Sequence, residues 1–175
     1  MKNLFVTTLC LTAFTLTACD KKPADSTTAK AEANVSAPAT SLSNNVAADI
    51  KSDLEQLQTL SNTKAQEALS FQSDLTQAAQ TGEKKALEAV VDKMDTYVDG
   101  FNDDLDTLKL KSSEAVNLRD KMKESNKIGL DLAEAGIDTT PDMNKITELQ
   151  KQAIDLQQSI LKDMQDLQTK AKTAA

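Results

Sequence analysis

The sequence predicts an all-α fold, an elongated antiparallel three-helix bundle of the up-down-up kind with coiled-coil-like packing. The 175 residues include only four Gly and three Pro, and Ala, Leu, Lys, Glu, Gln and Asp dominate, a composition typical of long helices. Apolar residues recur at steps of three and four, the spacing of an amphipathic helix. Gly-containing stretches interrupt this pattern at two places. We therefore expect residues 42–175 to form one helical bundle domain.

The first helix is predicted over residues 42–80. Its apolar positions include Ile50, Leu57 and Leu75. Beyond Gly82 the apolar positions change phase, and a Gly just after the last periodic residue is a helix C-cap signal. We expect a tight turn there and an antiparallel second helix.

The second helix is predicted to keep its register through Leu105 and on to Met122. Residues 125–129 contain Ser, Asn and Gly, which are poor residues for a helix interior. A bend is therefore expected there, or a short extra helix over residues 127–135 between the second and third helices.

The third helix is predicted to follow a Gly-capped helix end at Gly136. Thr140 before Pro141 has the pattern of an N-cap residue followed by Pro at the first helical position. Apolar residues from Ile146 onward then keep helical spacing, so this helix is expected to run to Ala171.

The N-terminus carries a different signal. Lys2 precedes an apolar run over residues 4–16, as in a secretory signal. The run ends in Leu16-Thr17-Ala18-Cys19, which resembles the lipobox of bacterial lipoproteins. The resemblance implies that residues 1–18 are a signal peptide cut before Cys19, and that Cys19 receives a diacylglyceryl group and an acyl group on its new amino terminus.

Two other interpretations of this segment are an uncleaved transmembrane helix and an ordinary secretory signal. A membrane-spanning helix needs about 20 apolar residues, and this run is shorter and contains several Thr. An ordinary signal ending at Ala18 would leave one unpaired cysteine at the mature terminus, because Cys10 lies in the discarded segment. A lipid on Cys19 accounts for that cysteine better.

Residues 19–41 are predicted to form the lipidated cysteine and a disordered tether. The segment is rich in Lys, Pro, Ala, Ser and Thr and has too few large apolar residues to fold. The tether is expected to reach about 25 Å, the random-coil distance for such a length. Asp20 directly after the lipidated cysteine resembles the signal that retains enterobacterial lipoproteins in the inner membrane, and it favours that membrane over the outer one weakly.

The chemistry expected of this chain is limited. It contains no His, and its mature part keeps only Cys19 as a cysteine, so we expect no enzyme with a Ser-His-Asp or Cys-His nucleophile and no imidazole metal site. No cofactor is expected apart from the covalent lipid. The formal charge of −7 falls to about −8 without residues 1–18, and such a domain is expected to repel nucleic acid and anionic membrane surfaces.

Two charged features invite a functional interpretation. Five carboxylates surround Gly100 over residues 95–106, a poor match to a twelve-residue calcium loop, and Gly100 more simply marks a kink or a close helix approach. Arg119 and Lys64 lie on the apolar seam and could contact an anion or a partner. A stem along the core with its charged head in water is the commoner arrangement.

The resemblance to lipoproteins built as helical bundles implies a structural, scaffolding or protein-binding role in the cell envelope, with the domain facing the periplasm. The alternative is a bundle that binds a lipid or small molecule. The partner would be an envelope protein or a second copy of the chain. The second helix is predicted to outrun the first. Either the chain folds back near residues 125–129 and closes the tip of the bundle, or this end presents an apolar partner surface made of Met122, Ile128, Leu130, Leu132 and Ile137.

The lipobox is tested by Cys19→Ser. The variant should lose membrane fractionation, because two or three acyl chains are what makes such anchoring stable, and it should remain soluble or uncleaved. Fractionation of cells followed by intact mass measurement checks both effects. A Cys19→Ser protein that stays with membranes after a high-salt wash, with an unchanged mass, would contradict the assignment.

Overall fold

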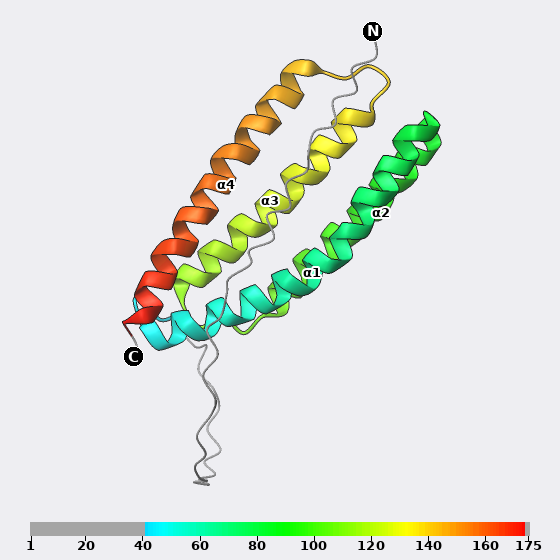
Figure 1. Cartoon of the computed structure of the whole chain (residues 1–175). Coiled ribbons are helices and arrows are strands. Elements are labelled where there is room, and N and C mark those ends of the chain that lie inside the picture. The colour runs from blue at the N-terminus through cyan, green and yellow to red at the C-terminus, as the bar shows by residue number, and fades with distance from the viewer. Residues whose placement is uncertain (1–40, 174–175) are drawn as a thin grey trace.

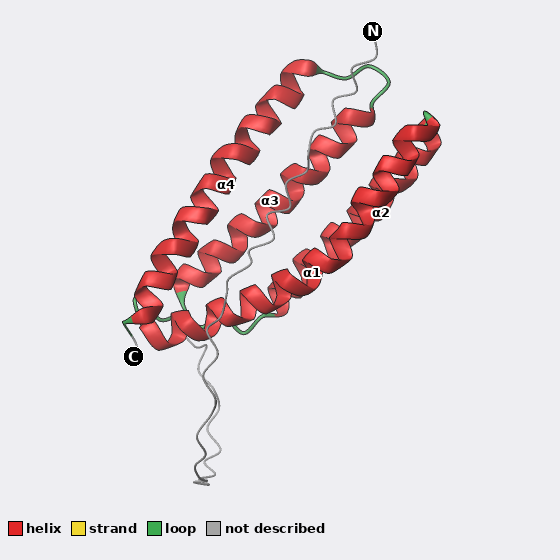
Figure 2. Cartoon of the chain, in the orientation of Figure 1, coloured by secondary structure: helices red, strands yellow, loops and turns green. Residues whose placement is uncertain are grey.

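The computed structural model describes residues 41–173, which form four antiparallel helices (Figures 1 and 2). They are α1 (Ala47–Thr81), α2 (Lys84–Thr107), α3 (Ser113–Ile137) and α4 (Met143–Lys172). The all-α class is confirmed, and the prediction of three helices is wrong. The predicted signal peptide and the predicted tether up to residue 40 lie outside the described residues.

The turn between α1 and α2 follows the prediction. Gly82 caps α1 in the left-handed conformation, with φ 68°, which Gly adopts without steric cost. The chain then reverses, and α1 and α2 form an antiparallel hairpin (Figure 1).

The predicted second helix is in fact two helices. It stops at Thr107, because Leu108 takes an extended backbone with ψ 136°. A new helix begins after Ser112, whose side chain accepts a hydrogen bond from the Ala115 N–H at 3.4 Å. Leu108 and Leu110 are half-buried against the core. Leu108, Ser112 and Ala115 keep the three-four spacing of the second helix through the break, so periodicity alone does not reveal it.

No bend or short separate helix replaces residues 127–135, because α3 is continuous through them. Tertiary contacts outweigh the weak propensity of this segment: Ile128 is buried, and the Asn126 side-chain amide donates to Asn102 Oδ1 on α2 at 3.0 Å. Gly136 lies inside α3, one residue before its end, and is not its cap. Gly100 marks no close approach, since a methyl group added there would meet no atom within 4 Å.

The last helix begins later than predicted. Its N-cap is Asp142, whose carboxylate accepts from the backbone N–H groups of Asn144 and Lys145 at 2.9 and 3.2 Å. Thr140 and Pro141 therefore precede the helix. Asp satisfies the free N–H groups of a first turn at least as well as Thr does, so the carboxylate two residues downstream sets the boundary.

The core has two parts. The base cluster is drawn from all four helices near the ends where the chain enters α1 and leaves α4. The far cluster, nearer the Gly82 turn, is drawn from α1 and α2, and Leu130 and Ala133 of α3 pack against it. The base cluster consists of Ile50, Leu57, Phe101, Leu105, Ala115, Leu118 and Leu167. The far cluster consists of Ala78, Val90 and Met94. All four helices therefore meet most fully at the base.

Leu105→Asp should unfold the domain, whereas Leu69→Asp should leave it folded. Leu105 is 0 % exposed and Leu69 is 58 % exposed. A carboxylate buried without a partner costs several kcal/mol, whereas a surface change usually stays within about 0.5 kcal/mol. Both variants place Asp inside a helix, so the propensity cost is shared. Thermal melts followed by circular dichroism measure the difference, and equal melting temperatures would refute this assignment of the core.

Candidate functional site

The first described residues are tied to the connection between α2 and α3. Ser43 N donates to the Lys111 carbonyl at 2.8 Å, and Ser113 N donates to the Ser43 carbonyl at 2.9 Å, which makes an isolated parallel bridge between Ser43 and Ser112. Asn45 N donates to Glu114 Oε1 at 2.8 Å. We call these contacts the base junction. They fix the point at which the chain arriving from the predicted anchor joins the bundle.

Beneath the base junction lies Asp53, a carboxylate that is 0 % exposed. Its Oδ2 accepts three hydrogen bonds: from Lys111 N at 2.9 Å, from Ser112 N at 2.7 Å and from the Ser112 hydroxyl at 2.7 Å. Gln56 Nε2 lies 3.5 Å from the other oxygen. Hydrogen bonds to a charged group are stronger than neutral ones. They hold the non-helical residues 108–112 against the start of α1.

Glu114 connects the base junction to α4 through its ion pair with Lys170. Partial burial pushes the pKa of this carboxyl up, but hydrogen bonds from its own N–H, from the Asn45 N–H and from the Ser113 hydroxyl, together with the Lys170 charge, outweigh burial and hold the pKa below its ordinary value. Lys170 Nζ lies 3.5 Å from Glu114 Oε1 and 2.6 Å from Asn45 Oδ1. The last turn of α4 is therefore part of the same arrangement.

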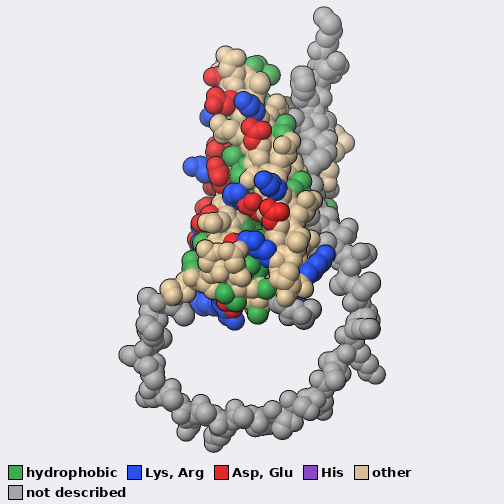
Figure 3. Space-filling model, turned by 90° about the vertical axis from the view of Figure 1, so that its left-hand side faces the viewer, with side chains coloured by type: hydrophobic (Ala, Val, Ile, Leu, Met, Phe, Trp, Pro, Cys, Tyr) green, Lys and Arg blue, Asp and Glu red, His purple; other side chains and the backbone are tan. Residues whose placement is uncertain are grey.

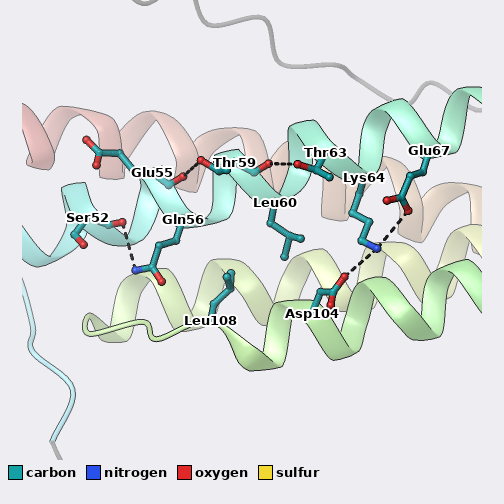
Figure 4. Close-up of a pocket in the computed structure, with 10 residues that line it drawn as sticks. All are labelled: Ser52, Glu55, Gln56, Thr59, Leu60, Thr63, Lys64, Glu67, Asp104 and Leu108. Atoms are coloured by element: carbon teal, nitrogen blue, oxygen red, sulfur yellow. Dashed lines mark hydrogen bonds and ion pairs between the residues drawn. The ribbon is translucent and has the colours of Figure 1, made fainter.

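An open groove runs between α1 and α2 (Figure 4). Leu60 and Leu108 point toward each other across it, and Lys64 reaches over to Asp104 (Figure 4). The lining residues are Ser52, Glu55, Gln56, Thr59, Leu60, Thr63, Lys64, Glu67, Asp104 and Leu108. The groove combines a small apolar floor with paired charges at one end.

Lys64 is the most enclosed charge of this groove, with a side chain 14 % exposed. Its Nζ lies 2.9 Å from Asp104 Oδ2 and 3.3 Å from Glu67 Oε2, and the hydrogen bond to Asp104 is the main reason why its pKa is raised. Tyr97 donates its hydroxyl to the Lys64 carbonyl at 2.8 Å, and burial raises the pKa of Tyr97 to about 12. The charge of Lys64 is thus balanced within the bundle.

Arg119 is also balanced by the chain's own carboxylates. Its Nε and Nη2 donate to Asp120 Oδ1 at 3.0 and 2.8 Å, and Asp106 Oδ1 lies 3.9 Å from Nε. Lys123 pairs with the same Asp106 and holds the pKa of that carboxyl below its usual value. Arg119 therefore serves as a bridge between α2 and α3.

The carboxylates around Gly100 do not form a calcium loop, because α2 is helical throughout residues 84–107. No group of His, Cys, Asp or Glu in residues 41–173 has the geometry to hold a metal ion. No helix in that range is long and apolar enough to cross a membrane.

The five residues of the predicted partner surface all lie on α3. Ile128 is buried, and the other four, Met122, Leu130, Leu132 and Ile137, are partly buried. Met122 packs against the base cluster and Leu130 against the far cluster. The four partly buried residues keep some exposed surface, and their role as a partner surface stays a prediction. The four lipobox residues, Leu16 to Cys19, lie outside the described range.

Sequence comparison identifies a lipoprotein family, in agreement with the lipobox at the N-terminus. The family model described as "Uncharacterised lipoprotein PM1805" matches residues 51–172, which covers most of the bundle. The chain belongs to this family. It is a bacterial lipoprotein, and membership implies anchoring to a membrane by lipid. No curated protein and no solved structure matches the chain.

Asp53→Ala should destabilise the domain by about 2–6 kcal/mol, because it leaves the buried Ser112 N–H and hydroxyl without an acceptor and each unmet group costs about 1–3 kcal/mol. Asp53→Asn should cost less. The side-chain carbonyl can take the place of Oδ2, so the Lys111 and Ser112 donors keep an acceptor, whereas the negative charge and the contact from Gln56 Nε2 are lost.

The control is Asp155→Ala on the exposed side of α4, which should change stability by less than about 0.5 kcal/mol. Urea unfolding gives the three free energies. The assignment of Asp53 fails if Asp53→Ala and Asp155→Ala unfold at the same urea concentration.

Proposed function

We propose that this protein is anchored to the cell envelope through lipid on Cys19, and that its bundle faces the periplasm as a structural, scaffolding or protein-binding module without catalytic activity. The sequence supports a non-catalytic role, since it has no His and the mature chain would keep one cysteine, which the lipid occupies. Asp20, next to that cysteine, favours retention in the inner membrane.

We place the protein-binding site of this proposal on one surface of α1. Leu69 is 58 % exposed and lies with Gln72, Ser73, Thr76, Gln77 and Gln80 along a shallow depression that contains no charged residue. Charged residues make up 27 % of the chain. Protein interfaces are depleted of charge at their centre, so this uncharged face is the natural contact for an envelope protein.

The alternative function is binding of a lipid or small molecule, and the α1–α2 groove is the feature that favours it. Its floor of Leu60 and Leu108 is apolar, as in ligand sites. The groove is open along its side, however, and its one lysine, Lys64, is already paired with Glu67 and Asp104. A ligand would gain little from them.

The experiment compares two exposed positions by crosslinking in cells. A photoreactive residue replaces Gln72 on the uncharged face or Asp92 on α2, and adducts are identified by mass spectrometry. An envelope protein should crosslink from position 72 and not from position 92, and adding Leu69→Lys should abolish the adduct.

Equal labelling from both positions would refute the protein-binding role. The purified protein is also extracted with organic solvent. One equivalent of bound lipid or small molecule, beyond the covalent anchor, would support the alternative.

A further inference from the structure

The distribution of charge along the bundle is uneven. We define the base end as residues 41–52, 107–114 and 168–173, which lie together at one end of the molecule (Figure 1). It carries five lysines and two carboxylates, whereas the rest of the described range carries 11 basic and 22 acidic residues. An acidic protein therefore has one locally basic end. The five lysines are Lys51, Lys109, Lys111, Lys170 and Lys172.

Four of these lysines face solvent without a partner. Lys170 pairs with Glu114, but the other four are exposed and make no ion pair within residues 41–173. Asp49, the second carboxylate of the base end, is half-buried in the first turn of α1. Basic side chains gather at the lower end of Figure 3, and along the body they alternate with acidic ones.

Apolar side chains accompany these lysines. Leu42 is 47 % exposed and Val46 is 43 % exposed, and both belong to the first described residues of the chain. Lysines beside exposed aliphatic side chains are the combination that binds the headgroup region of anionic membranes.

The base end lies close to the predicted lipid anchor along the chain, and this position indicates that the membrane is the surface it contacts. Ser41 continues toward Cys19, and 21 residues lie between those two positions. A chain of that length reaches about 25 Å as a random coil, so the end of the bundle that holds Ser41 stays close to the membrane. The acidic remainder of the bundle is repelled by the same surface.

We propose that the base end docks on the anionic headgroups of the membrane that carries the lipid anchor, through Lys51, Lys109, Lys111 and Lys172 with Leu42 and Val46. Docking stands the bundle with its Gly82 turn away from the membrane. The proposal rests on the lipid anchor of the proposed function, which places the base end near the membrane. Its test uses a protein without the anchor, so the docking proposal and the anchoring proposal can fail independently.

The test uses the chain from residue 19 onward with Cys19→Ser, which keeps every contact described above because all of them lie within residues 41–173. The protein should sediment with phosphatidylglycerol vesicles at low salt and be released at about 1 M salt, where the Debye length is about 3 Å. It should not sediment with phosphatidylcholine vesicles.

Two quadruple variants locate the effect. The base variant changes Lys51, Lys109, Lys111 and Lys172 to Gln, and the control variant changes the exposed body residues Lys85, Lys127, Lys145 and Lys151 to Gln. The two have the same net charge. A lysine near an anionic surface contributes roughly fivefold to partitioning, so the base variant should lose at least tenfold and the control less than about twofold.

The variant Leu42→Trp gives a second readout, because the chain contains no other Trp. Its emission should shift to the blue with phosphatidylglycerol vesicles and not with phosphatidylcholine. Equal loss of binding in both variants, or no vesicle binding by a protein that circular dichroism shows to be folded, would overturn the proposal. So would a dimeric mass in solution that the base variant reduces to monomer, because the lysines would then contact a second copy.

Discussion

The buried carboxylate of Asp53 is the contact on which the arrangement of the four helices depends. It lies on α1 and accepts from Lys111 and Ser112, which are 58 and 59 residues further along the chain. An ion without partners in such a place would cost several kcal/mol. Asp53 is therefore satisfied in only one geometry, with residues 108–112 laid across the start of α1. That geometry ends α2, begins α3 and sets the direction in which the second helical hairpin leaves the first.

This dependence explains which parts of the fold the sequence could predict. The body of α1, the turn at Gly82 and the body of α4 follow from local spacing and capping, and these predictions hold. The predicted start of the first helix at residue 42 is wrong, because Ser43 bridges to Ser112 and α1 begins at Ala47. The break after Thr107 does not follow from local spacing, because Leu108 and Ala115 stay in the same three-four register on its two sides. The acceptor that stabilises the break is far away in sequence. A serine followed two residues later by Glu114 was the one local signal, since both residue types are favoured at the start of a helix.

The functional features also divide into those encoded by neighbouring residues, which the sequence predicts, and those that only the fold assembles. A lipid anchor is specified by four consecutive residues, so it can be predicted without any fold, and family membership agrees with it. Lys64 and Arg119 stood out in the sequence as charges on an apolar seam, and the structure pairs both with carboxylates of neighbouring helices. The basic end could not be predicted, because its lysines come from three separate segments. Only the folded chain brings residues 41–52, 107–114 and 168–173, which carry these lysines, to one end.

The bridge at Ser43 also decides how the molecule carries a mechanical load. When an anchored protein is pulled by a partner, the tension passes along the backbone and reaches Ser43 before it reaches the first turn of α1. Ser43 is held by two backbone hydrogen bonds to residues 111 and 113, so α3 shares the force from the outset. Peeling α1 away from its hairpin partner would first require this bridge to break. The same few contacts that position the helices therefore spread a pulling force over α1 and α3 before α1 can separate from the bundle.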